Sequence, residues 1–331
     1  MQLYILLTET CNLHCPMCIR GHQHGNDLSL EMLQHIVNRG DLDGLDVVLT
    51  GGEPTQSPIV CEATRLVSRV AKTVCITTNG TDADRLCALQ GIPNFSVQVS
   101  IDGDATVHDE IRGRGTFTKV TATLSALEEH EIPYVVSSVV GRKNRMAIFR
   151  LATWLETLKR MRYWNVSFEM PFGNAGLENM MSSQEWNLFV DELLEYARVK
   201  LRIKKLFPFE LYDNHRAELM HLATKHRRLN CGSGRDKLYV YPDLSVYPCT
   251  CLQDHCVGNL TEKSLMEIQQ SECMRAFLEY HVLPQTICAS CDYLPFCNGG
   301  CIGMAVHYGG GMGMGDIRCP KIQAIQKMGR L

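Results

Sequence analysis

The placement of 16 cysteines constrains this chain more than any other feature of its sequence. Six of them precede residue 90, ten lie between Cys231 and Cys319, and none falls between Cys87 and Cys231. We expect a cytoplasmic protein, because the first residues lack the charged segment and apolar run of an export signal. Cytosolic thiols stay reduced, so metal ligation explains so many cysteines better than disulfides do. The two groups therefore predict two metal-binding regions.

Length and charge narrow the class of protein. A chain of 331 residues, of which 45% are hydrophobic, is long enough for one large α/β domain and a smaller one. The net charge of -3 offers no basic field for phosphates, which disfavours a nucleic-acid partner. No apolar run approaches the roughly 18 to 20 residues that span a bilayer, so we expect no membrane insertion.

The first two hundred residues alternate short β-branched runs with longer helical patterns, as βα units around a parallel sheet do. Strands are expected at Leu3–Leu7, Asp46–Leu49, Thr73–Thr77, Phe95–Ser100, Tyr134–Val140 and Asn165–Glu169. Helices are expected at Ser29–Arg39, Ser57–Val70, Phe117–Glu129 and Met146–Arg160. These units predict an α/β fold, a partial (β/α)6 TIM-like barrel over residues 1–205.

The pattern changes after this region. Ser182–Val199 reads as a long amphipathic helix, and residues 206–230 are expected to form a helical bridge. Residues 231–331 are expected to form a small second domain, with strands at Leu238–Tyr241 and Leu244–Tyr247 and one helix at Ser264–Tyr280. A domain built around metal needs little apolar core of its own.

Cys11, Cys15 and Cys18 have CxxxCxxC spacing directly after the first expected strand. They should lie at the carboxyl end of that strand, where parallel barrels carry their active sites. Three close thiolates suit three corners of a [4Fe–4S] cluster and leave one iron without a protein ligand. The alternative is a zinc knuckle, which needs a fourth ligand such as His14 or His22.

Three further motifs end the next three strands: TGGEP at 50–54, TNG at 78–80 and SIDG at 100–103. All should lie at the same barrel mouth as the cysteines. Paired glycines let the backbone approach a ligand closely, a carboxylate beside them can hold an ammonium group, and a strand-end Ser or Asp can bind ribose hydroxyls. Each motif alone also reads as an ordinary turn.

Taken in order, these four motifs resemble those of the radical S-adenosylmethionine (SAM) superfamily, and the stretch from Ser100 to Phe117 resembles its branch with a C-terminal SPASM extension. The resemblance implies that Cys11, Cys15 and Cys18 hold the cluster whose open iron binds SAM. The SAM contacts that it implies are Gly51 and Gly52 beside the methionine moiety, Glu53 at its amine, Thr78, Ser100 and Asp102 near the ribose, and Arg112 at the carboxylate.

The later cysteines are similar to the SPASM pattern, with CxxCx5CxxxC spacing from Cys288 to Cys301. The resemblance implies an inner auxiliary [4Fe–4S] cluster on Cys231, Cys249 and Cys301, and an outer one on Cys288, Cys291, Cys297 and Cys319. Without the N-terminal motifs, two zinc sites would fit the later cysteines equally well.

The chain departs from these patterns at four positions. Met17 stands where an aromatic residue is usual, and its thioether can also pack beside adenine. Leu244 stands where a glycine is usual. Cys251 and Cys256 are additional, and either is a candidate fourth ligand of the inner cluster unless that iron stays open for substrate.

The resemblance implies reductive cleavage of SAM to a 5′-deoxyadenosyl radical, which abstracts hydrogen from a peptide or protein side chain and leads to an oxidative modification or cross-link. It also implies a low-potential electron donor such as flavodoxin or ferredoxin. Since the chain begins almost at its first strand, we expect the peptide to be held either by the barrel itself or by a separate leader-recognition protein. The alternatives are a tetrapyrrole side-chain oxidase and a non-enzymatic iron–sulfur carrier or scaffold.

No catalytic acid or base is readable from the sequence. Candidate substrate contacts are Glu210, Tyr212, Asp213 and His215 on the expected bridge, and His22 and His24 after the cysteine motif. Pro171–Gly176, after the sixth strand, is a candidate to close over the adenine.

Overall fold

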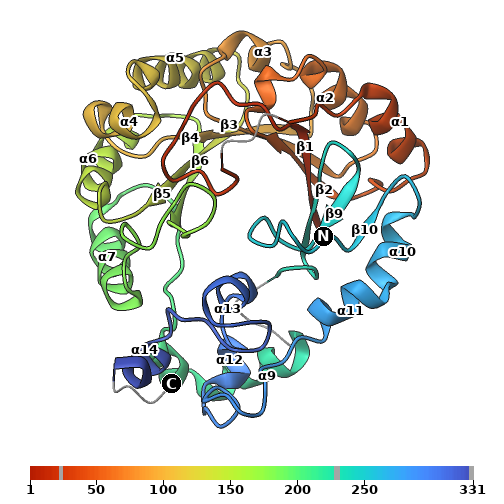
Figure 1. Ribbon diagram of the computed structural model, residues 1–331. Helices are drawn as coiled ribbons and strands as arrows, with labels where there is room; N and C mark the ends of the chain where they lie inside the picture. Colours follow the sequence, from red (N-terminus) through yellow and green to blue (C-terminus); the bar gives the residue numbers. More distant parts are fainter. Residues whose placement is uncertain (22–24, 227–231, 328–331) are drawn as a thin grey trace.

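The computed structural model describes residues 1–21, 25–226 and 232–327. Its centre is one ten-stranded sheet with the order β10-β9-β8-β1-β2-β3-β4-β5-β6-β7. Figure 1 shows this sheet curving into an open ring, with the helices of the first half of the chain on the outside. Among the described residues, no helix is long and apolar enough to cross a membrane.

The six central strands confirm the expected partial barrel. They are β1 (Gln2–Thr8), β2 (Asp46–Gly51), β3 (Thr73–Thr78), β4 (Phe95–Ser100), β5 (Tyr134–Val140) and β6 (Met161–Phe168). Each pairs in parallel with the next, so their carboxyl ends meet at one edge of the ring. β6 begins four residues earlier than expected.

The helices between these strands begin and end close to their predicted positions. They are α1 (Leu30–Asn38), α2 (Val60–Ser68), α5 (Thr116–Glu129), α6 (Arg145–Leu155) and α7 (Ser183–Tyr196). Capping sets several of the starts: the Ser29 hydroxyl accepts from Met32 N, and Ser182 and Glu185 form a capping box. The short elements η1 (Pro54–Gln56), α3 (Ala83–Cys87) and α4 (Ala105–Arg112) were not expected.

The expected second domain continues the barrel sheet. β8 (Lys237–Val240) pairs in parallel with β1, and β9 (Ser245–Tyr247) and β10 (Gly258–Asn259) extend it as antiparallel strands. Leu238, Val240, Leu244 and Val246 belong to the same buried apolar cluster as the barrel strands. This segment therefore shares the core of the barrel.

The remaining helices gather on the open side of the ring (Figure 1). After β7 (Leu201–Arg202), they are α8 (Phe209–Asn214), α9 (Arg216–His226), α10 (Leu265–Gln270), α11 (Glu272–Leu278), α12 (Leu294–Cys297), α13 (Ile302–Tyr308) and α14 (Pro320–Lys327). The prediction of one helix over Ser264–Tyr280 is wrong. Ser271 ends α10 with an extended backbone (ψ 157°) and caps α11 by accepting from Met274 N.

Leu244 explains why a glycine is usual at its position. Its φ of 64° lies in the left-handed region, which costs a residue with a Cβ roughly 1–2 kcal/mol. Its side chain is 1% exposed and packs in the main core, so apolar burial offsets that strain.

We predict that Leu244→Gly and Leu244→Ala both destabilise the protein, with the glycine variant retaining about 1 kcal/mol more unfolding free energy than the alanine variant. Both lose the buried side chain, but only glycine relieves the strain. Urea unfolding followed by circular dichroism measures this order. At Leu238, buried in a regular strand, the same pair of substitutions should give the opposite order, since glycine weakens a strand. Equal stability of the two Leu244 variants would contradict the prediction.

Candidate functional site

Gly51 and Gly52 bring the end of β2 against the segment that leads into the cysteine loop. Gly52 N donates to Thr8 O at 2.8 Å, and Glu53 N donates to Thr10 O at 2.8 Å. A Cβ on either glycine would overlap one of those two carbonyl oxygens. The glycines are therefore required by this backbone packing, and their expected place beside the methionine moiety of SAM stays a prediction.

Cys11, Cys15 and Cys18 lie together on the loop after β1 as half-buried free thiols. The loop turns back on itself, with Cys18 N donating to Cys15 O at 3.2 Å. Burial, together with the neighbouring thiols of Cys11 and Cys18, raises the pKa of Cys15 to about 11. The thiols thus lie within electrostatic reach of one another, as three ligands of one cluster must.

A buried ion pair lies beside these thiols. Arg112 Nε donates to Asp102 Oδ2 at 2.5 Å, and Val139 N donates to Asp102 Oδ1 at 2.8 Å. Asp102 is fully buried, and the charge of Arg112 opposes the rise in pKa of both Cys11 and Cys15. An enclosed cation stabilises the negative charge of three thiolates, so the residues present fit a cluster held by those thiolates. Both oxygens of the Asp102 carboxylate accept hydrogen bonds from the protein itself. Its expected place near the ribose stays a prediction.

Glu53 joins the ends of β2 and β3. Its Oε1 accepts from Thr55 N at 3.1 Å, Thr55 Oγ1 at 2.8 Å and Thr78 Oγ1 at 2.7 Å, and its Oε2 accepts from Asn79 N at 2.7 Å. Burial raises the pKa of this carboxyl, although the hydrogen bonds oppose the rise. Glu53 and Thr78 therefore have a structural role, and their expected SAM contacts remain predictions. Ser100 is half-buried at the end of β4.

Sequence reasoning gave no role to two residues of α4, the helix that ends with Arg112. His108 Nδ1 accepts from Asp102 N at 3.2 Å, and burial, with the charge of Arg112, lowers the pKa of His108 to about 4. Asp109 accepts from Gly115 N at 2.6 Å and from Phe117 N at 2.8 Å, which fixes the start of α5. Both belong to the HDEIRGRGTF stretch, so the signal was present in the sequence.

A cavity of about 90 Å³ lies beside Met17, between the cysteine loop and the ends of β5 and β6. Its lining residues are Pro16, Met17, Ile111, Val139, Lys143, Asn144, Glu169, Asn174, Ala175, Gly176, Glu178 and Asn179. Sequence reasoning missed Asn144, Glu169 and Asn179. The wall includes three residues of Pro171–Gly176, the segment predicted to close over the adenine. Asn174 also ties that segment to the cysteine loop, since its backbone N donates to Cys18 O at 2.9 Å.

The four cysteines of the outer set come together as expected. Burial raises the pKa of Cys288 to about 11 and of Cys297 to about 12, and the other thiols of this set add to both shifts. Cys288, Cys297 and Cys319 share an apolar cluster with Tyr212 from the bridge, and Asp213 accepts from Tyr293 Oη at 2.7 Å. These two candidate substrate contacts thus pack near the outer thiols. His215 and Glu210 lie exposed on the same segment.

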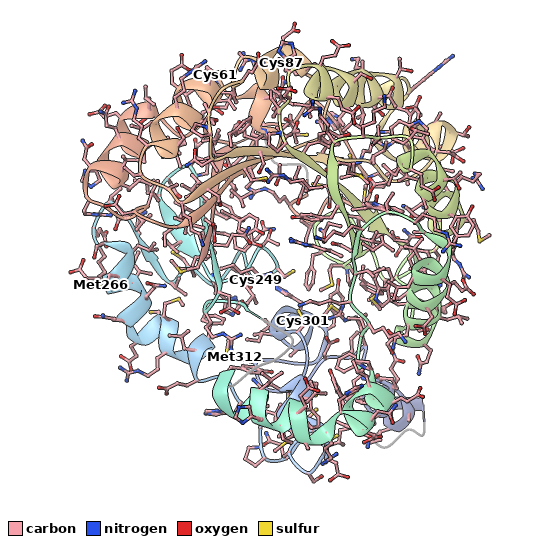
Figure 2. All side chains as sticks on the ribbon, turned by 180° about the vertical axis from the view of Figure 1, so that it is seen from behind. Cys61, Cys87, Cys249, Met266, Cys301 and Met312 are labelled. Atoms are coloured by element: carbon pink, nitrogen blue, oxygen red, sulfur yellow. The ribbon has the colours of Figure 1, made fainter. Side chains whose placement is uncertain are left out.

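Of the expected inner set, Cys249 and Cys301 are described and Cys251 lies beside them. Cys231 lies outside the described residues, as do His22 and His24. Cys251 N lies 3.5 Å from Cys249 Sγ, and a hydrogen bond from the Cys251 thiol lowers the pKa of Cys249 to about 6. The Cys301 thiol helps to raise the pKa of Cys251. Figure 2 shows Cys249 and Cys301 near the middle of the molecule.

The two additional cysteines differ in their surroundings. Cys251 is buried within the inner set, whereas Cys256 is exposed and its thiol donates to Gly258 O at 3.3 Å. We therefore expect Cys251, and not Cys256, to supply the extra inner ligand. Within residues 1–21, 25–226 and 232–327, no three His, Cys, Asp or Glu side chains are grouped to hold a single metal ion.

Two family models match separate parts of this chain. Residues 5–155 match the family model of the radical SAM superfamily, and residues 231–292 match SPASM, an iron–sulfur cluster-binding domain. The chain is 25% identical over 316 residues to the AdoMet-dependent heme synthase of Methanosarcina barkeri, covering 88% of each. It is 22% identical over 320 residues to the cysteine-type anaerobic sulfatase-maturating enzyme of Clostridium novyi, covering 89% of this chain and 85% of that one.

A solved structure shares the fold. Streptococcus suis SuiB bound to its precursor peptide SuiA superposes with a TM-score of 0.79 at 16% identity, over 97% of this chain and 75% of SuiB. SuiB has also been solved with S-adenosylmethionine bound. At this identity the likeness shows the fold alone.

We predict that Asp102→Asn lowers the unfolding free energy of the iron-free protein by about 3–5 kcal/mol, because Arg112 is left buried without its counter-charge. Asp102→Asn combined with Arg112→Met should recover part of that loss. Urea unfolding of the two variants and the wild type measures both effects. A single variant as stable as the wild type would show that the pair is not closed to water.

We predict that Cys251→Ala lowers the iron content of the anaerobically reconstituted protein by up to about four irons per chain, the content of one [4Fe–4S] cluster. Cys256→Ala is the matched control and should keep the wild-type content. Iron and sulfide analysis measures the difference. Loss of iron in Cys256→Ala alone would assign the extra ligand to Cys256.

Proposed function

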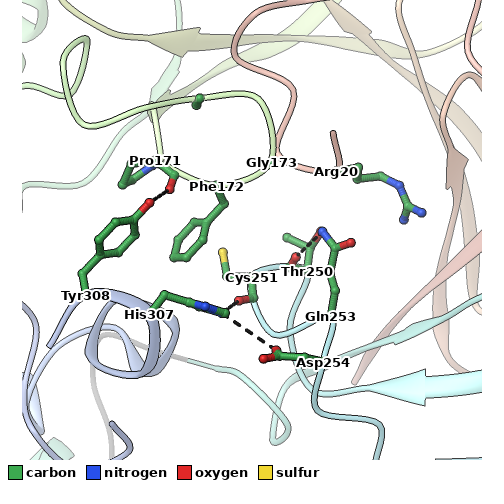
Figure 3. Close-up of a pocket in the computed structure, with 11 residues that line it drawn as sticks. Arg20, Pro171, Phe172, Gly173, Thr250, Cys251, Gln253, Asp254, His307 and Tyr308 are labelled. Carbon is green, nitrogen blue, oxygen red and sulfur yellow. Dashed lines mark hydrogen bonds and ion pairs between the residues drawn. The ribbon is translucent and has the colours of Figure 1, made fainter. Parts of the chain in front are cut away.

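Because the chain belongs to the radical SAM superfamily and carries a SPASM iron–sulfur domain, we propose that it is an enzyme that oxidatively modifies or cross-links a side chain of a peptide or protein. One observation carries this proposal: a cavity of about 520 Å³ reaches from the cysteine loop to the inner thiols. Arg20, two residues after Cys18, and Cys251 both line it (Figure 3). A side chain bound there would lie between the cysteine loop that carries Cys11, Cys15 and Cys18 and the inner cysteines.

The cofactors follow from the family: SAM with a [4Fe–4S] cluster, and auxiliary iron–sulfur clusters in the SPASM domain. Cys11, Cys15 and Cys18 would hold the first cluster, and the inner and outer thiols the auxiliary ones. When bound, SAM and the first cluster supply the one-electron chemistry that removes a hydrogen atom from an unactivated carbon.

The residues of this chain provide position and shielding. Gly51 and Gly52 let the end of β2 approach the segment leading into the cysteine loop, and Arg112 places an enclosed cation beside the thiols. Phe172 and Tyr308 wall the larger cavity with aromatic surface, which excludes water from a bound side chain.

The relatives support a peptide or protein substrate. One is named for sulfatase maturation, and SuiB was solved with its precursor peptide. A tetrapyrrole side chain is the second candidate, because a relative named as a heme synthase matches over 88% of the chain. An iron–sulfur carrier is disfavoured, since it would have no need of the GGEP and SxDG strand ends.

Three further points belong to this proposal. A flavodoxin or ferredoxin supplies the electron, and a separate protein recognises the leader of the substrate. We also propose a cytoplasmic location, because cluster ligation by so many cysteines requires reduced thiols, the state that reducing compartments maintain.

We predict about twelve irons per chain after anaerobic reconstitution, the content of three [4Fe–4S] clusters, and 5′-deoxyadenosine formation with SAM and dithionite. Replacing Cys11, Cys15 and Cys18 together with alanine should abolish that product and remove about four irons. Iron analysis and chromatography measure both. The same triple replacement at Cys61, Cys87 and Cys273 is the matched control; Figure 2 shows Cys61 and Cys87 at the rim, far from Cys249. Stoichiometric zinc, or iron without SAM cleavage by the wild type, would refute the proposal.

A further inference from the structure

The cavity that reaches from the cysteine loop to Cys251 is formed by four separate parts of the chain, of which the cysteine loop contributes Arg20. The loop after β6 contributes Phe172, the segment after β9 contributes Cys251 and Asp254, and α13 contributes His307 and Tyr308. Its volume of about 520 Å³ lies in the range of small-ligand sites, roughly 300–1,000 Å³. Nothing in the sequence motifs indicates what enters it.

Contacts among the lining residues fix the shape of the cavity. The Phe172 ring lies edge-to-face against His307, with centroids 5.4 Å apart, and tilted against Tyr308 at 5.8 Å. The Tyr308 hydroxyl donates to Pro171 O (Figure 3). These contacts join α13 to the loop after β6 and hold the aromatic side chains of the wall in place.

The one lysine or arginine among the lining residues adds little positive charge to the space. Arg20 Nη2 lies 3.7 Å from Glu9 Oε1, and the two side chains are only 12% and 14% exposed. Its guanidinium also lies over the Tyr241 ring, 4.7 Å from the centroid. Nη2 has no hydrogen-bond partner among the described residues, but it is closed to solvent. Figure 3 shows the Arg20 side chain pointing away from Cys251.

Asp254 provides the accessible charge of the cavity. Its side chain is 62% exposed, and it is the only carboxylate among the lining residues. Its ion-pair partners among the described residues are two imidazoles: His255 Nδ1 at 2.8 Å and His307 Nε2 at 3.9 Å. His307 Nε2 also lies 3.0 Å from Cys251 O, so that nitrogen is shared with a backbone carbonyl. The opening therefore presents a carboxylate without a lysine or arginine partner.

From this lining we propose that the cavity binds a basic side chain of the substrate peptide, with its ammonium or guanidinium group at Asp254 and its aliphatic stem against Phe172 and Tyr308. The inference rests on the proposed function and names the substrate class of the same site. An anionic tetrapyrrole fits poorly, because burying its carboxylates requires cationic partners and the one arginine of the lining already pairs with Glu9.

Saturation-transfer NMR on the reconstituted, anaerobic enzyme at pH 8 tests this inference. The probes are N-acetyl-lysine methylamide and N-acetyl-norleucine methylamide, whose side chains differ in the terminal ammonium group. The lysine compound should bind about three- to fivefold more tightly, the size expected for one partly exposed ion pair. Asp254→Asn should remove that preference and leave norleucine binding unchanged.

Asp191→Asn is the matched control, because Asp191 is similarly exposed, at 51%, and lies on the outer helix α7. It should keep the lysine preference. Equal binding of the two compounds by the wild type, a preference that survives in Asp254→Asn, or displacement of the lysine compound by iron coproporphyrin III would overturn the inference. Assaying 5′-deoxyadenosine in the same preparations separates the two failures. SAM cleavage without lysine preference refutes only the substrate class, whereas absence of SAM cleavage refutes the proposed function.

Discussion

The parallel pairing of β1 with β8 is the contact on which the rest of the molecule depends. It joins Gln2 to Lys237 and Ile5 to Val240, residues more than two hundred positions apart in the chain. The same strand β1 pairs with β2 on its other side and leads into the cysteine loop. Cys249 and Cys251 follow the β8–β9 hairpin, and Gln253 Nε2 beyond them donates to Ile19 O at 3.3 Å. Both metal-binding regions are thereby anchored to a single strand.

A buried arginine–aspartate pair lies beside the first set of cysteines, and a second such pair lies beside the inner set. Arg112 with Asp102 lies beside the first thiols, and Arg318 with Asp316, joined at 2.6 Å, lies beside the inner ones. Asp316 also accepts from Cys301 N at 3.0 Å, which ties the second pair to a thiol-bearing segment. Thiolate-held clusters bring negative charge into a poorly solvated interior, and an enclosed guanidinium offsets that charge. The carboxylate in turn fixes where the guanidinium lies.

Overall sequence similarity does not distinguish a peptide substrate from a tetrapyrrole substrate, whereas the lining of the larger cavity bears on that choice. Relatives named for heme synthesis and for sulfatase maturation match this chain over nearly the same length. The cavity has a carboxylate at its opening and an arginine already paired with Glu9, which favours a cationic peptide side chain over a carboxylate-bearing macrocycle. Our proposal therefore assigns discrimination between the two substrate classes to Asp254, a residue outside every motif.

Local pattern was enough to predict the barrel strands and the cysteine groupings, because strand and helix periodicity and ligand spacing are properties of short segments. At Leu244 the sequence showed only a departure from the usual glycine, and the structure shows that this position has a left-handed backbone. Ser271 shows a local limit: a helical pattern continues across it, while its extended backbone breaks the helix. Only tertiary structure decided the union of β8 with β1, the engagement of Glu53 and Asp102 by distant partners, and the burial of Cys251 where Cys256 is exposed. Each depends on contacts between residues far apart in sequence, whose energies no single segment contains.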